Sequence, residues 1–281
     1  MNTLKKVIAG VLAGVTMISL AACGGSSSSD GSASSQQGQT VEQIKKAGTI
    51  RIATFGDLPP YGYVKNDGTR AGYDVALGNQ VAKDLGVKVD WVQVNADGRV
   101  DALKSDKVDL VLANFTVTDE RKQVVDFASP YMKVSIGVVS PDKAKITSAD
   151  QLKGKTLAVT KGTTAETFFT QNYPDVNLQK FDSKTQQFQA FKDGRADALA
   201  DDNTYLYAWA KDNKGYTVGV KTLGEESTIS PAVKKGNKSL LDWTNKEIKT
   251  LTEQGFFEKA YQSELAPSFT SDIKPEDVII K

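Results

Sequence analysis

Short apolar runs alternate with helical segments along this chain of 281 residues, and the alternation limits the fold more than any other feature. Between two such runs, Leu77, Val81 and Leu85 recur every fourth position, which predicts a helix that ends at Gly86. A shorter helix is expected over residues 98–105. The strands expected around these helices are residues 49–55, 87–94 and 108–113. Strand and helix in this order are typical of a mostly parallel sheet with helices on both faces.

The same alternation restarts in the second half of the chain, which predicts a second lobe of the same α/β class. Its expected strands are residues 155–160, 177–181 and 196–200, and its expected helices are residues 164–171 and 184–192. Two apolar extended stretches, residues 134–140 and about 222–234, join the lobes as a two-stranded hinge. Helices over residues 239–254 and 256–261 then return to the first lobe. The predicted limits are residues 41–135 plus 225–281 for lobe 1 and residues 136–224 for lobe 2.

The N-terminal segment has the anatomy of a secretory signal peptide over residues 1–22. Two lysines precede an apolar run from Val7 to Leu20, which is shorter than the ~20 residues of a membrane-spanning helix. Leu-Ala-Ala-Cys, ending at Cys23, matches the bacterial lipobox, which implies cleavage before Cys23 and lipid, including palmitate, on that residue. The alternative is a core cysteine in an accidental setting. Residues 23–40, rich in Ser, Gly and Gln, are expected to be a flexible tether to the outer face of the cell membrane.

Composition excludes several classes of function. Cys23 is the only cysteine and the chain has no histidine, which removes an intramolecular disulfide, the usual general base and the usual zinc ligand. The 35 basic and 34 acidic residues are nearly balanced, so the net charge is too small to attract nucleic acid to the protein. Residues 153–156 are similar to the end of a phosphate-binding loop, but Ala149 stands where that motif requires glycine. We therefore expect no catalytic residue, metal, cofactor or nucleic-acid partner.

The segment that starts at Asn114 carries the most specific motif of the chain. It reads Asn-Phe-Thr-Val-Thr-Asp-Glu-Arg, followed shortly by Val-Asp-Phe-Ala-Ser-Pro-Tyr. This pattern resembles the signature of the polar amino-acid-binding proteins of bacterial ABC importers, solute-binding family 3, and the resemblance extends from about residue 41 to the C-terminus. A guanidinium can hold an α-carboxylate through two charge-assisted hydrogen bonds, so Arg121 is the expected carboxylate ligand, with Thr116 and Asn114 beside it. The alternative for Arg121 is a surface ion pair with Asp119 or Glu120.

The resemblance implies further contacts from the second lobe. Thr163 and Thr164 stand between a predicted strand and a predicted helix, where free N–H groups and hydroxyl donors favour an anion. The family closes the carboxylate site with this turn, although plain helix capping by threonine is an equal alternative. The family places an aspartate for the ligand ammonium at the position that Asp202 matches. Asp201 is adjacent, and the alternative is that both aspartates cap the next helix.

The remaining candidate contacts lie in the first lobe. Phe55, Tyr61 and Tyr63 surround the loop after the first strand, where the family builds an aromatic wall over the ligand, and their alternative is ordinary core packing. Some family members carry an aspartate at the position of Phe55, so its absence leaves more of the ammonium binding to Asp202. Arg99 is a candidate for facing the ligand side chain, but its place in a predicted helix favours a solvent-exposed side chain.

The resemblance implies a two-lobe fold of the periplasmic-binding-protein type (type II) and an extracytoplasmic receptor that closes on a free amino acid. Its partners would be an ABC permease and the ATPase of that permease. The residues around 55–63, 113–116 and 202–204 look most like the cysteine-binding branch of the family, so L-cysteine is the expected ligand. Glutamate or aspartate, glutamine and cystine remain alternatives. A dehydratase acting on cyclohexadienyl acids, or an adhesin or sensory module on the same fold, is a more distant alternative, and the lack of histidine argues against the enzyme.

Overall fold

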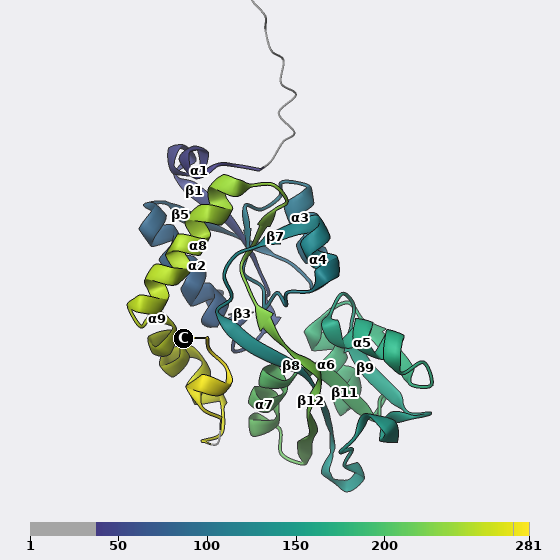
Figure 1. Ribbon diagram of the computed structural model, residues 1–281. Coiled ribbons are helices and arrows are strands. Elements are labelled where there is room, and N and C mark those ends of the chain that lie inside the picture. The colour runs from purple at the N-terminus through teal and green to yellow at the C-terminus, as the bar shows by residue number, and fades with distance from the viewer. Residues whose placement is uncertain (1–37, 272, 281) are drawn as a thin grey trace, which may run out of the picture. The chain divides into compact units, whose positions relative to one another are not determined.

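The structure is a computed structural model that describes residues 38–271 and 273–280. The predicted signal peptide, the predicted lipidation site Cys23 and most of the predicted tether therefore lie outside the described residues. The described chain falls within one compact unit, Gln36–Lys281. It contains two five-stranded sheets, in the orders β5-β1-β6-β13-β7 and β10-β9-β11-β8-β12, and a small three-stranded sheet (Figure 1).

The first sheet contains the three strands predicted in the first half of the chain. Its strands, in spatial order, are β5 (Lys88–Gln93), β1 (Thr49–Thr54), β6 (Leu110–Val111), β13 (Ala232–Lys234) and β7 (Val125–Phe127). In the register, Ile52 of β1 lies opposite both Trp91 and Leu110, and both pairings are parallel. The chain returns late to add β13, which runs antiparallel to both of its neighbours. The helices of this lobe are α1 (Val41–Ala47), α2 (Tyr73–Leu85), α3 (Gly98–Lys104), α4 (Asp119–Val124), α8 (Lys238–Glu253) and α9 (Phe256–Ala260).

Helix α2 shows how the sequence pattern builds this lobe. Leu77, Val81 and Leu85 are all buried, as their spacing predicts, and pack in the main hydrophobic cluster. Gly86 ends the helix in the left-handed conformation, with φ of 73°, and its N–H bonds the carbonyls of the last turn. Such a C-cap favours glycine because glycine has no Cβ.

The second sheet contains the predicted second lobe. Its strands, in spatial order, are β10 (Asn177–Phe181), β9 (Thr156–Thr160), β11 (Ala198–Asp202), β8 (Met132–Pro141) and β12 (Tyr216–Ile229). Its helices are α5 (Thr164–Asn172), α6 (Lys184–Lys192) and α7 (Asn203–Asp212). Strand β11 ends at Asp202, two residues later than predicted, so Asp202 is the last residue of a buried strand. Helix α7 begins at the next residue.

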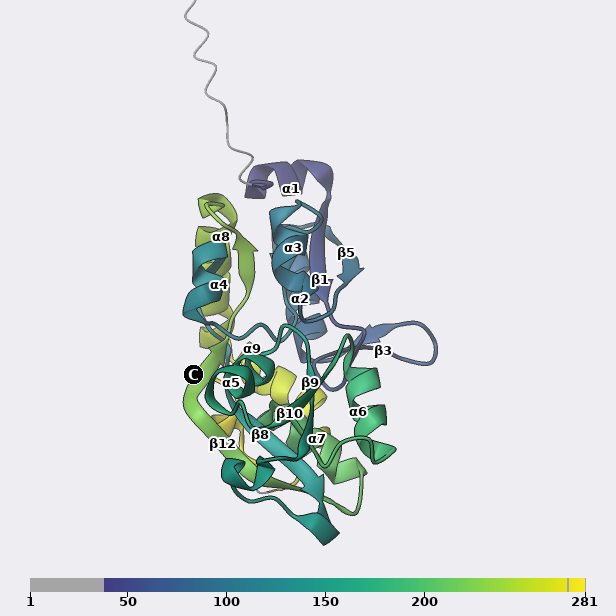
Figure 2. The ribbon, with the colours of Figure 1, turned by 90° about the vertical axis from the view of Figure 1, so that its right-hand side faces the viewer.

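Strands β8 and β12 form the predicted hinge, and both views show them side by side (Figures 1 and 2). Their antiparallel register runs from Tyr216 opposite Pro141 to Ile229 opposite Met132. Ile279, close to the C-terminus, forms a further bridge with Met132 at the start of this pair. The two-lobe prediction is confirmed. The sheets are mixed and not mostly parallel as predicted, because each combines two parallel pairings with two antiparallel ones that the returning strands add. The exact residue limits of the lobes stay a prediction.

Some local structure has no counterpart in the sequence prediction. The loop after β1 contains the small sheet of β2 (Asp57–Leu58), β3 (Gly62–Val64) and β4 (Arg70–Ala71). Gly72 follows this sheet with φ of 115°, and a Cβ there would lie 2.3 Å from the Tyr61 carbonyl oxygen. Short helical turns complete the chain at Asp142–Ala144, Ala149–Leu152, Tyr261–Leu265, Ala266–Ser268 and Pro275–Asp277. Within the described ranges, none of the helices is both long enough and apolar enough for a membrane span.

Candidate functional site

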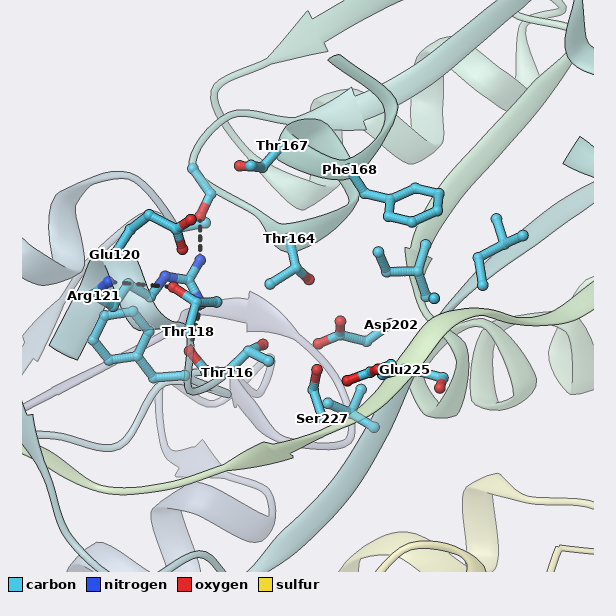
Figure 3. Close-up of a pocket in the computed structure, with 18 of the residues that line it drawn as sticks. Thr116, Thr118, Glu120, Arg121, Thr164, Thr167, Phe168, Asp202, Glu225 and Ser227 are labelled. Carbon is cyan, nitrogen blue, oxygen red and sulfur yellow. Dashed lines mark hydrogen bonds between the residues drawn. The ribbon is translucent and has the colours of Figure 1, made fainter. Parts of the chain in front are cut away.

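A cavity of about 490 Å³ receives side chains from both lobes and from the hinge strands (Figure 3). It adjoins a much smaller cavity of about 10 Å³, and the two share Thr116, Thr164 and Asp202 among their lining residues. Asp202 is the last residue of β11, and Thr116 and Thr164 follow β6 and β9 within a few residues. The carboxyl ends of strands are where open α/β sheets bind ligands. The residues predicted for ligand binding are therefore brought largely to one place.

Arg121 lines the larger cavity from α4 and is held there by backbone oxygens. Its guanidinium donates hydrogen bonds to the carbonyl of Thr116 at 2.6 Å and to the carbonyl of Gly162 at 2.8 Å. It also lies 4.8 Å from the centre of the Phe115 ring, a favourable cation–π distance. Burial lowers the pKa of Arg121 to about 10, so the group stays charged at neutral pH.

The alternative of a surface ion pair for Arg121 is not what the structure shows. Asp119, three residues before Lys122, pairs with that lysine at 3.1 Å. Thr118 caps α4 by accepting a hydrogen bond from the Arg121 N–H at 3.2 Å, which fixes the start of the helix. The charge of Arg121 is thus balanced by carbonyl dipoles and remains available to an anion in the cavity.

Arg99 is buried, so the expectation of a solvent-exposed helix residue is wrong. Its side chain donates to the carbonyls of Ala96, Ala113, Asn114 and Gly162 at 2.8 to 3.1 Å. The guanidinium lies 4.4 Å from the centre of the Phe115 ring, on which Arg121 also stacks. Burial is tolerated because these acceptors replace water. Burial, followed by the charge of Arg121, holds the pKa of Arg99 well below its usual value.

The carbonyl of Gly162 accepts hydrogen bonds from both arginines and so links the two lobes. Gly162 stands in the turn before α5 with φ of 72°, and a Cβ there would lie 2.5 Å from the Cα of Asp97. Its own N–H donates to the Glu166 carboxylate at 2.7 Å. Close approach of the lobes at this point requires glycine. Sequence reasoning missed this contact, because a backbone carbonyl carries no residue signature.

Asp202 lines both cavities and is 7% exposed. It makes no side-chain capping bond to α7, contrary to the alternative, and accepts instead from the Asn114 amide nitrogen at 2.7 Å. The neighbouring Asp201 pairs with Lys184 and accepts the Asp202 N–H at 2.9 Å. The two aspartates thus have separate partners. Burial and the charge of Asp201 raise the pKa of Asp202 to about 6, while Lys184 and Arg99 act in the opposite direction.

Asn114 is held in an unusual backbone conformation, with φ of 43°. Its N–H donates to the buried Asp74 carboxylate at 2.7 Å, and Asp74 also accepts from the Tyr131 hydroxyl at 2.6 Å. Burial raises the pKa of Asp74 to about 6. Sequence reasoning missed Asp74, although it lies three residues before Leu77 on the apolar face of α2. A carboxylate on an apolar stripe was the available signal.

The two threonines of the turn before α5 have different roles. The Thr163 hydroxyl caps α5 by accepting from the Glu166 N–H at 3.2 Å and donates to the Thr160 carbonyl at 2.7 Å. Thr163 therefore caps α5, which is the alternative stated above, and of the two cavities it lines only the smaller one. Thr164 lines both cavities, and Figure 3 shows it between Arg121 and Asp202. Thr164 is therefore placed where it can contact a ligand directly.

The three predicted aromatic contacts are separated in the structure. Phe55 lines the smaller cavity and lies 5.7 Å from the Arg99 guanidinium carbon. Tyr61 is fully buried in the core of the first lobe, and Tyr63 is partly exposed in β3. Neither tyrosine is among the residues that line these two cavities. An aromatic wall over a ligand stays a prediction for the two tyrosines.

The chemistry available in the cavity is binding of opposite charges. Arg121 supplies a cation and Asp202 a carboxylate, and hydroxyl groups of Thr116, Thr164 and Ser227 lie among the lining residues (Figure 3). In the part of the chain that the structure describes, no group of three or more His, Cys, Asp or Glu residues is arranged to hold a metal ion.

Comparison with known proteins agrees with this geometry. The sequence model of the bacterial extracellular solute-binding proteins, family 3, matches residues 50–265. The chain belongs to this family. A crystal structure of the solute receptor for L-cysteine of Neisseria gonorrhoeae is 50% identical and covers 86% of this chain and 100% of its own, with a TM-score of 0.85. A cysteine-binding protein from Campylobacter jejuni is 48% identical and covers 86% of this chain and 98% of its own, with a TM-score of 0.84.

Curated family-3 relatives extend the comparison to other solutes. The ABC transporter glutamine-binding protein GlnH of Bacillus subtilis is 30% identical over 252 residues, which cover 88% of this chain and 92% of that protein. The chain is thus similar to proteins named for different solutes.

Proposed function

We propose that this family-3 protein is a receptor for a free L-amino acid and that it binds the zwitterion between its two lobes. The observation that carries the proposal is the placement of Arg121 and Asp202 on one cavity from different lobes. An α-carboxylate is the natural partner of the guanidinium, and an α-ammonium is the natural partner of the carboxylate. A ligand that contacts both lobes favours the closed conformation, because it gains contacts there that the open conformation lacks.

L-Cysteine is the solute that we favour. The support comes from the two cysteine receptors that are 48% and 50% identical to this chain. The glutamine-binding relative is more distant, at 30% identity. Glutamate or aspartate, glutamine and cystine are the alternatives within the same class.

We further propose that the protein works at the outer face of the cell membrane, attached through lipid on Cys23, and hands its solute to an ABC permease. Support for the transporter comes from the Bacillus subtilis relative, which is a binding protein of an ABC transporter. Support for the lipid comes from the residues that precede Cys23. In this role the protein is a binding protein and not an enzyme.

Calorimetric titration of the purified protein tests the proposal directly. Solute carried through purification is first removed by partial unfolding and dialysis, and the common L-amino acids are then titrated, with cysteine kept reduced and cystine included. Selective binding of one amino acid with micromolar affinity or tighter is the expected result, with cysteine the tightest. No binding across the panel would break the link between Arg121, Asp202 and a zwitterion.

A further inference from the structure

The small cavity beside Asp202 has a polar feature that the zwitterion contacts do not use. Its volume of about 10 Å³ is close to the space of one water-sized group. Asn114 lines it and is 5% exposed, and the side-chain oxygen Oδ1 of Asn114 has no hydrogen-bond partner. Among the described residues that line either cavity, no other buried side-chain nitrogen or oxygen lacks a partner. Buried polar atoms are normally paired, so this atom requires an explanation.

The neighbours of Asn114 fix the orientation of its amide. An ionised carboxylate only accepts hydrogen bonds, so the amide must present its nitrogen to Asp202, as it does at 2.7 Å. The backbone of Asn114 is held on both sides, because its N–H donates to Asp74 and its carbonyl accepts from Arg99 at 2.9 Å. Oδ1 is therefore a preset acceptor in the wall of the small cavity.

Apart from Asn114 Oδ1, the polar side chains that line only the small cavity, and not the larger one, are already paired. Lys184 and Asp201 form an ion pair in which both side chains are 3% exposed. The Thr163 hydroxyl bonds within the turn before α5, and all the nitrogens of Arg99 bond carbonyls. Apolar contacts come from Phe55 and Leu58, which also line the space. On the side away from the larger cavity, the small cavity thus suits one heavy atom that donates a single hydrogen bond to Asn114 Oδ1 and otherwise meets paired or apolar groups.

We propose that this small cavity is the side-chain subsite for α-amino acids that carry on Cβ a single heavy atom able to donate a hydrogen bond. The thiol of cysteine fits it best and the hydroxyl of serine second, with Asn114 Oδ1 as the acceptor. A thiol is a weak donor that otherwise behaves as a small apolar group, so it is cheaper to desolvate than a hydroxyl. The inference rests on the proposed function, because the small cavity adjoins Asp202, to which that function assigns the ligand ammonium.

A ligand series on the unaltered protein tests the subsite. L-Cysteine, L-serine, L-2-aminobutyrate and S-methyl-L-cysteine are titrated by calorimetry at neutral pH. L-2-Aminobutyrate replaces the thiol with a methyl group and leaves Oδ1 unpaired, so we expect it to bind at least about tenfold more weakly than cysteine. S-Methyl-L-cysteine adds an atom that the cavity does not hold and should bind about 100-fold more weakly or not at all. Equal affinities for cysteine and L-2-aminobutyrate would overturn the assignment.

The variant Asn114→Gly assigns the effect to the residue. Glycine adopts a φ of 43° without strain, and the substitution removes the side-chain amide. The variant should therefore bind cysteine and L-2-aminobutyrate with about equal affinity. Thermal melting of the unliganded variant shows whether the variant folds. If the variant does not fold, the ligand series on the unaltered protein decides whether the subsite exists. A preference that persists in the folded variant would overturn the role of Asn114. Tight binding of a long side chain such as glutamine contradicts this subsite alone, whereas no binding of any amino acid contradicts the proposed function as well.

Discussion

At the residue scale, Arg121 and Asp202, two of the charged residues that line the cavity, are held in the same way. Arg121 is held by the carbonyls of Thr116 and Gly162, and Asp202 is held by the Asn114 amide. Each charge is therefore positioned by neutral dipoles and not neutralised by a direct counter-ion. Such a charge is costly to bury without a partner. Under the proposed function, a ligand group of opposite charge would recover this cost and so add to the free energy of binding.

Removal of Arg121 should therefore abolish or greatly weaken binding without unfolding the protein. Arg121→Ala leaves the ligand carboxylate desolvated and unpaired, a loss of about 2–5 kcal/mol, or about 30-fold to several thousand-fold in affinity. Calorimetric titration measures the loss, and thermal melting checks the fold. The matched control is Arg195→Ala, since the Arg195 side chain is 55% exposed and its removal should change neither value. A folded Arg121→Ala protein that binds within a few-fold of the unaltered protein would show that another group holds the carboxylate.

Affinity should also depend on pH through Asp202. Its pKa is raised to about 6 by burial and by Asp201, and only the ionised form attracts an ammonium. Affinity should be nearly constant above about pH 7 and fall as pH drops through 6, by up to about tenfold per pH unit below it. Asp74, with a pKa also raised to about 6, is separated from this effect by Asp202→Asn. That variant should bind weakly at pH 8 and show little further loss down to pH 5, whereas an unchanged fall in affinity would assign the titration to Asp74.

At the scale of elements, the turn before α5 meets the start of α3. Gly162 combines a φ of 72° with a space that a Cβ would fill at 2.5 Å from the Cα of Asp97. Gly162→Ala should hold the lobes apart and weaken solute binding by tenfold or more, since each 1.4 kcal/mol of lost contact is a factor of ten. Gly154→Ala is the control, because Gly154 has a φ of 71° and open space around it. An equal loss of affinity in both variants would assign the loss to backbone strain, and no loss in either variant would show that a Cβ at position 162 does not hold the lobes apart.

Helices α2 and α8 meet through a pair of carboxyl groups. Burial, and then the nearby Asp84, raise the pKa of Glu247 to about 7 from an ordinary value of 4.5. The folded protein therefore prefers neutral Glu247, and this preference lowers stability above pH 7 and is relieved as pH falls towards 4.5. Glu247→Gln should raise the melting temperature at pH 8 and have little effect at pH 4.5. Glu253→Gln, on the exposed face of the same helix, should show no such pH dependence, and a pH-independent gain for Glu247→Gln would argue against this pair.

The sequence predicts helices and strands well where buried residues recur at a regular spacing. It predicts contacts poorly where a side chain binds backbone groups that are far away in the sequence. Helix α2 and strands β1 and β5 follow from their apolar spacing. The small sheet of β2, β3 and β4 does not, because strands of two or three residues in a loop rich in Gly and Pro have no measurable period. The assignment of Arg121 to the cavity followed from a motif. The burial of Arg99 was missed, because its acceptors are backbone carbonyls supplied by both lobes.

At the scale of the whole molecule, the hinge strands are also part of the wall of the cavity. The long strands β8 and β12 supply lining residues such as Ser135 and Ser227 to the cavity and also connect the lobes. In the proposed function, a solute that fills the cavity would touch the segments that bend when the lobes close. Hinge closure needs only a few residues at the ends of elements to change their backbone angles. Under the proposed function, binding and closure would be coupled through these two strands, without a separate signalling element.

Attachment to the membrane should be separable from binding, because Cys23 lies outside the compact unit of Gln36–Lys281 that contains the cavity. In cells, the unaltered protein should sediment with membranes and incorporate labelled palmitate. Cys23→Ser removes the thiol that carries the lipid, so the variant should lose the label and leave the membrane fraction. The purified variant should bind its solute with unchanged affinity, which serves as the internal control for folding. Retention of the label by the variant would mean that the lipid is attached elsewhere, and retention in the membrane without the label would mean that an uncleaved signal segment anchors the chain.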